Sequence, residues 1–293
     1  MAKKIFSGVA TALVTPFCED GVDYSSFERL IEYQIESGVD ALVFCGTTGE
    51  APTLDEREKR EIFSFARKTV GKRVPIILGT GTNDHKRTMR LCEYAASLEP
   101  DAMLCVSPYY NKGTEDGIVR SFFEICSCGI PVILYNVPTR TGVDIKGELL
   151  SRLFELDRIC AIKECAGVGR ISEHICRYDG RFSVYTGNDS ELLPSLSVGA
   201  DGVISVLSNL YPSMVKALYT AYRKGEVDSA AAIHKSLHEI SALMFCETNP
   251  APIKYCLSKK GLCKNLLRLP MSEAGAELCK KIDKEMKKIE QNI

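Results

Sequence analysis

The sequence lacks the features of membrane, nucleic-acid-binding and phosphate-loop proteins. No apolar stretch approaches the length of about 20 residues that a membrane-spanning helix needs. The net charge is −1, so no basic field would attract nucleic acid or an anionic membrane. The glycine fingerprint of a doubly wound, phosphate-binding sheet is missing. A hydrophobic content of 45% and a charged content of 26% are typical of a soluble globular protein.

Paired cysteine motifs are absent as well. The chain has 13 cysteines, which is an odd number, and none of them forms a CxxC pair. The Cys126-Ser127-Cys128 run is too tight for a usual zinc knuckle. Cys45, Cys105 and Cys160 lie in apolar runs, where a thiol behaves as a small hydrophobe. We therefore predict reduced thiols and a cytoplasmic location.

The N-terminus has two possible interpretations. Lys3-Lys4 and the apolar run at residues 5–14 superficially resemble a secretion signal. Ser7 and Thr11 interrupt the run, however, and Thr15-Pro16 ends it as a strand would end. We favour a first strand.

Short apolar runs recur along the chain, and each is followed by an amphipathic stretch. This alternation predicts eight strand–helix units, which close into a (β/α)8 barrel. Helix caps are expected at Asp55, at Asn83-Asp84 and at Asp189-Ser190. The predicted strands are Val9–Val14, Ala41–Cys45, Val74–Gly79, Ala102–Val106, Val132–Tyr135, Cys160–Lys163, Ser183–Gly187 and Gly202–Val206.

The barrel is predicted to span residues 1–224, and residues 225–293 form a separate helical region. Helical patterns there cover Val227–Phe245, Ala251–Lys260 and Ser272–Ile289. These helices either cover the flank of the barrel or form an oligomer contact, and the sequence does not decide between the two.

Several predicted strands end in polar residues. Catalytic groups of such barrels gather at the carboxyl ends of the strands, so these residues are predicted to share one mouth. For each segment alone, a turn is the simpler explanation. The segments are Cys45–Glu50, Ser107–Asn111, Tyr135–Gly142, Lys163-Glu164, Gly187–Asp189 and Ile204-Ser205.

Lys163 ends the apolar run that begins at Ile159. A lysine at the end of a buried strand points into a dry mouth, where desolvation lowers its pKa and makes the amine nucleophilic. Such an amine can form a Schiff base. The alternative is a lysine that leaves the strand and reaches water.

Together these residues resemble the dihydrodipicolinate synthase and N-acetylneuraminate lyase family of Schiff-base barrels. The resemblance runs from about Phe6 to Pro270. It is carried by Gly46-Thr47-Thr48-Gly49-Glu50, by Tyr135-Asn136-Val137-Pro138 and by Ile162-Lys163-Glu164.

The resemblance implies that pyruvate condenses on Lys163 without a cofactor, because the lysine itself is the electron sink. It gives Tyr135 the role of moving protons during imine formation. Thr47 and Tyr110 would complete a proton relay, with Tyr110 reaching in from a neighbouring subunit. At least a dimer would then be required, and the family suggests a homotetramer.

The resemblance also implies the substrate contacts. Thr48 would hold the pyruvate carboxylate, and the backbone at Gly187 and Ile204 would line the other side. Arg140 would form a bidentate pair with the carboxylate of L-aspartate 4-semialdehyde. This favours synthesis of 4-hydroxy-tetrahydrodipicolinate, the committed step of the diaminopimelate/lysine pathway. The alternative is an N-acetylneuraminate or 2-keto-3-deoxy sugar acid lyase.

Regulation is expected to differ from that of lysine-inhibited relatives. Glu56, Lys59 and Arg87 stand where those relatives supply histidines and an acid for the effector's ammonium groups, while Asn83 and Tyr109 agree with their pattern. A cation at Arg87 would repel an ammonium, so we expect weak or absent inhibition by lysine. The alternative is that Glu56 replaces the lost acid.

Two alternative functions are less well supported: metal-dependent catalysis and the binding of metabolites without catalysis. His234 and His238 share one helix face, as zinc ligands do, but no third ligand is in view. We predict no metal site. A barrel that binds metabolites without catalysis is disfavoured by the presence of Lys163, Tyr135 and Thr47.

Overall fold

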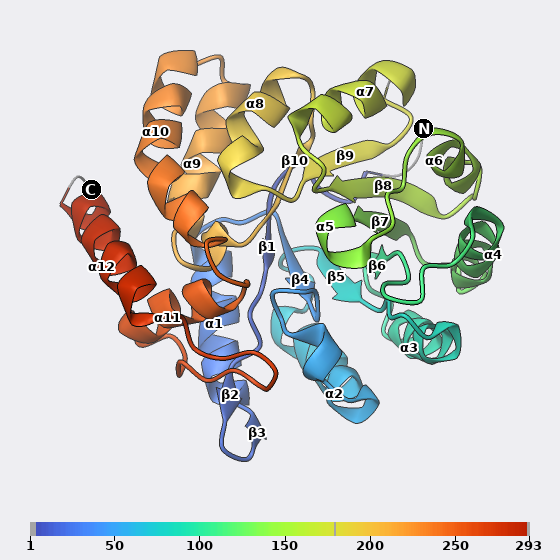
Figure 1. The fold of residues 1–293 in the computed structure, drawn as a ribbon, viewed down its shortest axis with the longest axis horizontal. Helices are drawn as coiled ribbons and strands as arrows, with labels where there is room; N and C mark the ends of the chain where they lie inside the picture. Colours follow the sequence, from blue (N-terminus) through green and yellow to red (C-terminus); the bar gives the residue numbers. More distant parts are fainter. Residues whose placement is uncertain (1–3, 179, 292–293) are drawn as a thin grey trace.

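A closed barrel of eight parallel strands forms the centre of the computed structural model, which describes residues 4–178 and 180–291 (Figure 1). Each strand pairs with the next one along the chain, and β1 closes the barrel against β10. The predicted (β/α)8 fold is confirmed, with strand ends that differ from the predicted ones by two residues or fewer. The strands are β1 Gly8–Ala12, β4 Ala41–Phe44, β5 Ile76–Gly79, β6 Ala102–Val106, β7 Val132–Asn136, β8 Ile159–Glu164, β9 Ser183–Thr186 and β10 Gly202–Ser205.

Helices surround this barrel (Figure 1). Asp55 begins α2 with a capping box, and the carboxylate of Asp84 accepts hydrogen bonds from the first N–H groups of α3. The helices are α1 Tyr24–Glu36, α2 Glu56–Val70, α3 His85–Ser97, α4 Glu115–Cys126, α5 Pro138–Thr141, α6 Gly147–Phe154, α7 Val168–Tyr178, α8 Leu192–Ser197, α9 Pro212–Arg223, α10 Val227–Leu243, α11 Ala251–Lys259 and α12 Ala276–Glu290.

Several short elements were not predicted. A small hairpin joins β2 (Phe17–Cys18) to β3 (Gly21–Val22), and the single-turn helix α5 follows β7. Elements of two to four residues are too short to show a helical or strand period in the sequence.

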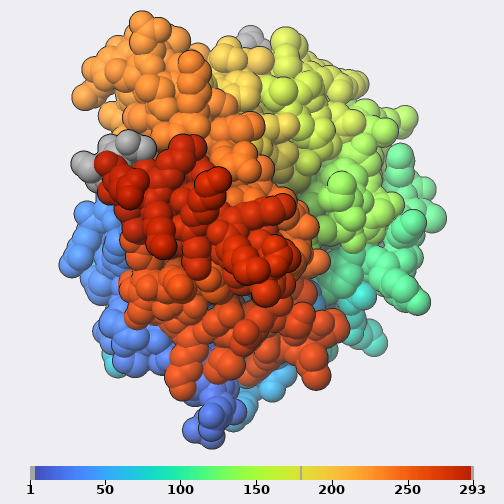
Figure 2. Space-filling model, turned by 60° about the vertical axis from the view of Figure 1, so that its left-hand side comes forward, coloured from blue at the N-terminus to red at the C-terminus, as the bar shows by residue number. Residues whose placement is uncertain are grey.

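The C-terminal helices pack on the flank of the barrel. Leu237 and Ile240 of α10 and Ile282 of α12 belong to one buried apolar cluster with Val9 of β1 and Val203 of β10. Figure 2 shows the C-terminal part of the chain, coloured orange to red, spread over one broad face of the molecule. These helices therefore cover the flank of the barrel, and their predicted role as an oligomer contact stays a prediction. No helix within the described ranges is both long enough and apolar enough to cross a membrane.

Candidate active site

Lys163 lies inside the mouth of the barrel. It is only 5% exposed, although it stands one residue before the end of β8. In the parallel pairing of β7 with β8 it is the partner of Tyr135, and its Nζ lies 4.5 Å from the centre of the tyrosine ring. The side chain therefore remains in the dry interior and does not reach out to water.

Burial shifts the ionisation of both groups. Desolvation lowers the pKa of Lys163, which favours the neutral amine; nearby Cys165 and Asp189 oppose this shift and Arg140 adds to it. Desolvation raises the pKa of Tyr135, so its hydroxyl keeps its proton at neutral pH. A buried amine therefore lies beside a protonated phenol, which is the pair that imine chemistry requires.

The loop after β4 places two threonines next to this pair. Thr47 is half-buried, and its hydrogen bond with Tyr135 partly offsets the rise in the tyrosine pKa. Thr48 is buried, and its Oγ1 accepts a hydrogen bond of 3.0 Å from Nδ2 of Asn249. Among the described residues, no acceptor takes the backbone N–H of Thr47 or Thr48. These donors are available for a carboxylate.

A cavity of about 230 Å3 opens beside Tyr135 and Thr47, whereas Lys163 and Thr48 are not among the residues that line it. It is lined by Thr47 and Tyr135 together with Arg140, Tyr109 and Lys59. A larger hollow of about 620 Å3 lies on the outside of the barrel beside α2, but none of the strand-end residues lines it. The smaller cavity is therefore the candidate site.

Arg140 reaches the cavity from α5, which begins directly after β7. Its Nη2 donates a hydrogen bond of 3.4 Å to the backbone carbonyl of Asn249. Asn249 therefore contacts both Thr48 and Arg140, and its Oδ1 is buried without a partner among the described residues. Sequence reasoning missed Asn249, because only the fold brings it to a loop about 200 residues earlier.

Gly187 follows β9 and lies beside Lys163, on the side of β8 away from Tyr135. Its N–H donates a hydrogen bond of 2.8 Å to the carbonyl of Glu164. A Cβ at this position would lie 2.2 Å from Sγ of Cys165 and 2.8 Å from Cε of Lys163. Any larger residue would displace the lysine. The absence of a side chain thus keeps the amine in place.

Asp189 fixes the end of β10, where Ile204 lies fully buried. Its Oδ2 accepts hydrogen bonds from the N–H groups of Val206 at 2.9 Å and Leu207 at 3.0 Å, and its Oδ1 accepts one from the Ser205 hydroxyl. The prediction that Asp189 caps the following helix is therefore wrong. The carboxylate bridges two strand ends instead, and α8 begins without a side-chain cap.

Within one chain, the side chain of Tyr110 lies apart from the other predicted site residues. Its side chain is 90% exposed and does not line the cavity. Its φ of 71° lies in the left-handed region, which is uncommon for a bulky residue. The relay that includes Tyr110 stays a prediction.

A buried polar cluster supports the strand on its outer side. Glu164, which follows Lys163, accepts hydrogen bonds from Nδ2 of Asn136 at 2.9 Å and from the backbone N–H of Ala166 at 2.8 Å. Nε2 of His174 lies 2.9 Å from the same carboxylate, and both side chains are buried. His174 therefore holds the residue next to the reactive lysine, a contact that only the fold brings about.

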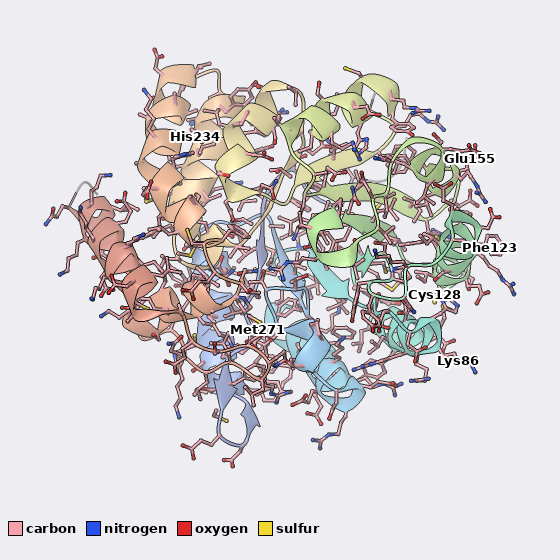
Figure 3. The ribbon with its side chains drawn as sticks, viewed as in Figure 1. Lys86, Phe123, Cys128, Glu155, His234 and Met271 are labelled. Carbon is pink, nitrogen blue, oxygen red and sulfur yellow. The ribbon has the colours of Figure 1, made fainter. Side chains whose placement is uncertain are left out.

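His234 and His238 do not line the candidate cavity. Both lie on α10, with ring centres 5.8 Å apart, and Figure 3 labels His234 on that outer helix. Within residues 4–178 and 180–291, no group of three or more potential metal ligands is found.

The chain matches a model of the Dihydrodipicolinate synthetase family over residues 5–289. It is 40% identical to the 4-hydroxy-tetrahydrodipicolinate synthase of Acetivibrio thermocellus, with 97% of this chain and 99% of that protein covered. The corresponding enzyme of Pelobacter propionicus is 42% identical, with coverages of 94% and 97%.

Solved structures resemble the whole chain. The dihydrodipicolinate synthase of Aquifex aeolicus superimposes with a TM-score of 0.93 at 39% identity, covering 97% of this chain and 98% of its own. The dihydrodipicolinate synthase of Cyanidioschyzon merolae, solved with lysine bound, gives a TM-score of 0.94 at 32% identity. The match covers 98% of this chain and 99% of that one.

Proposed function

The chain belongs to the dihydrodipicolinate synthetase family, and we propose that it condenses pyruvate with L-aspartate 4-semialdehyde to 4-hydroxy-tetrahydrodipicolinate. The observation that carries this proposal is a buried amine in contact with a phenol, which lines one cavity together with an arginine. The activity is that of a lyase in the diaminopimelate/lysine pathway, as the names of the relatives indicate.

The first step is imine formation at Lys163. The neutral amine attacks the pyruvate carbonyl, and the resulting carbinolamine must gain and lose protons before water leaves. Tyr135, whose ring lies against the amine and whose hydroxyl is protonated, supplies and recovers these protons. Thr47 passes them on, and Tyr110 of a neighbouring subunit completes the relay.

The pyruvate carboxylate binds at the loop after β4. The Thr48 hydroxyl and the unused N–H groups of this loop can surround it without crowding the amine. Gly187 and Ile204 close the opposite wall, where the missing side chain at Gly187 leaves room beside the imine.

The second step forms a carbon–carbon bond. Loss of a methyl proton turns the imine into an enamine, whose carbon attacks the aldehyde of the second substrate. Arg140 holds the carboxylate of that substrate in a bidentate pair. The amino group of aspartate semialdehyde then attacks the imine carbon, closes the ring and displaces the Lys163 amine. The reaction therefore needs no cofactor.

The same proposal includes a homotetramer in the cytoplasm. The exposed Tyr110 supports a shared site, because its side chain extends away from its own barrel and is free to reach a neighbouring subunit. All 13 cysteines are free thiols, which supports a reducing compartment.

The choice of acceptor tests the proposed reaction. With pyruvate present, the enzyme is expected to consume aspartate semialdehyde and to leave N-acetylmannosamine and glyceraldehyde unused. The reason is that Arg140 offers a pair of donors for a carboxylate, which neither alternative acceptor has. Pyruvate consumption with each acceptor is measured in parallel, and turnover of either sugar would instead favour a sugar-acid lyase.

Inhibition by lysine is expected to be weak or absent. The Glu56 carboxylate, which could have replaced the lost acid, is already held by Arg60 at 2.8 Å and Arg90 at 2.9 Å. Lys59 is a buried cation with a pKa lowered to about 8 by desolvation, and Arg87 is a second cation nearby. A steady-state assay checks this, and clear inhibition by sub-millimolar lysine would refute it.

A further inference from the structure

Glu50 ends the threonine loop and is engaged on both carboxylate oxygens. Its side chain is buried, and its φ of 54° is unusual for a residue with a Cβ. Oε1 accepts a hydrogen bond of 2.5 Å from Nζ of Lys254, and Oε2 accepts one of 3.0 Å from the backbone N–H of Arg268. Both partners come from the C-terminal region, more than 200 residues away.

Lys254 is completely buried in α11. In addition to its bond with Glu50, the ammonium donates a hydrogen bond of 2.7 Å to the carbonyl of Leu266. It also lies 4.1 Å from the centre of the Phe17 ring. Desolvation lowers its pKa and the charge of Glu50 opposes that shift. The lysine therefore joins α11, the following loop and the barrel mouth through one buried charge.

Arg268 holds the same loop a few residues further on. Its guanidinium donates to the carbonyl of Thr53 at 3.0 Å and to both oxygens of Glu58 at 2.7 and 2.5 Å. In Figure 1 the segment between α11 and α12 runs past the β2–β3 hairpin toward α2, in agreement with these contacts. We call Lys254 and Arg268 the C-terminal clamp.

Stability alone does not explain the buried ion pair between Glu50 and Lys254. A buried ion pair must offset the desolvation of both charges, and well-packed apolar residues are often as stable in its place. What the ion pair adds is a defined geometry. Glu50 stands two residues after Thr48, so the position of its carboxylate fixes the end of the turn that carries Thr48 and Thr47, of which Thr47 lines the cavity.

We propose that Glu50 and Lys254 are positioning residues, which set the loop of Thr47 and Thr48 so that it can bind the pyruvate carboxylate. The proposal rests on the function proposed above. It gives the C-terminal region a role in the reaction, because a residue of α11 controls the geometry of the first substrate site.

The test compares the steady-state constants of Lys254→Met with those of the unaltered protein. The KM for pyruvate is expected to rise by about tenfold, because a loop displaced by a fraction of an ångström loses directed hydrogen bonds. The KM for aspartate semialdehyde is expected to change by less than about twofold, since Arg140 contacts neither Glu50 nor Lys254 and meets this region through a 3.4 Å hydrogen bond to the Asn249 carbonyl.

Further variants separate positioning from folding. Glu50→Gln combined with Lys254→Met removes both buried charges and should fold, yet it should also show the raised KM. Lys254→Arg keeps a cation and should recover part of the pyruvate affinity. The control is Lys216→Met, which breaks the ion pair with Asp40 at the amino-terminal end of the barrel. It should lower the melting temperature at most and leave both KM values unchanged.

The outcomes distinguish this proposal from the proposed function. If the unaltered protein forms a pyruvate adduct while the folded double variant keeps its KM for pyruvate, Glu50 and Lys254 have no positioning role. A loss of melting temperature without a change in KM also overturns it. If the unaltered protein forms no adduct at all, the proposed function itself fails.

Discussion

Lys163→Ala is expected to lower turnover by at least about a thousandfold, which corresponds to about 4 kcal/mol of lost transition-state stabilisation. The amine is the group that bonds to pyruvate, and neither the phenol nor the hydroxyls around it can form an imine. Turnover with pyruvate and aspartate semialdehyde measures the effect.

Two further variants show that the loss is chemical. Lys163→Arg keeps a long cationic side chain but is never neutral, so it should be as inactive as the alanine variant. Lys235→Ala removes an exposed lysine of α10 and should have full activity. The melting temperature of each variant is followed in parallel. Vigorous turnover by a folded Lys163→Ala protein would contradict the mechanism.

Arg140→Ala is expected to separate the two half-reactions. The guanidinium is proposed to bind only the second substrate, so kcat/KM for aspartate semialdehyde should fall about tenfold to a hundredfold, as expected for a lost charged hydrogen-bonding pair. Formation of the pyruvate adduct should change little. Arg140 is exposed, so solvent screens its influence on the pKa of Lys163 and Tyr135.

The matched control is Arg120→Ala, because Arg120 is an exposed arginine on α4 whose nearest partner is Glu124. It should leave both half-reactions unchanged. Arg140→Lys keeps the charge but loses the bidentate geometry and should give an intermediate value. Unchanged condensation by Arg140→Ala would show that the second substrate is assigned wrongly.

The barrel was predictable because its pattern is local. Each central strand is a short apolar run, and the polar residue that ends it follows from the sequence alone. Lys163 and Tyr135 therefore stand out as candidates by their positions at strand ends, and the pairing of β7 with β8 confirms that they are neighbours. The helix cap at Asp55 could also be predicted from the sequence, because a capping box has a fixed spacing.

The missed features depend on contacts between distant parts of the chain. Asn249 bonds to Thr48, and Lys254 bonds to Glu50, across about 200 residues for which no periodic pattern exists. Asp189 looked like a helix cap because its local sequence allows one. The structure instead uses its carboxylate to hold the backbone after β10, since those N–H groups are buried and need an acceptor.

The most direct test of the central claim is borohydride reduction in the presence of pyruvate, followed by peptide mass analysis. We predict that the protein gains the mass of one reduced pyruvyl group and that the modified residue is Lys163. A protein that gains no such mass, or that gains it on another lysine, would contradict the account.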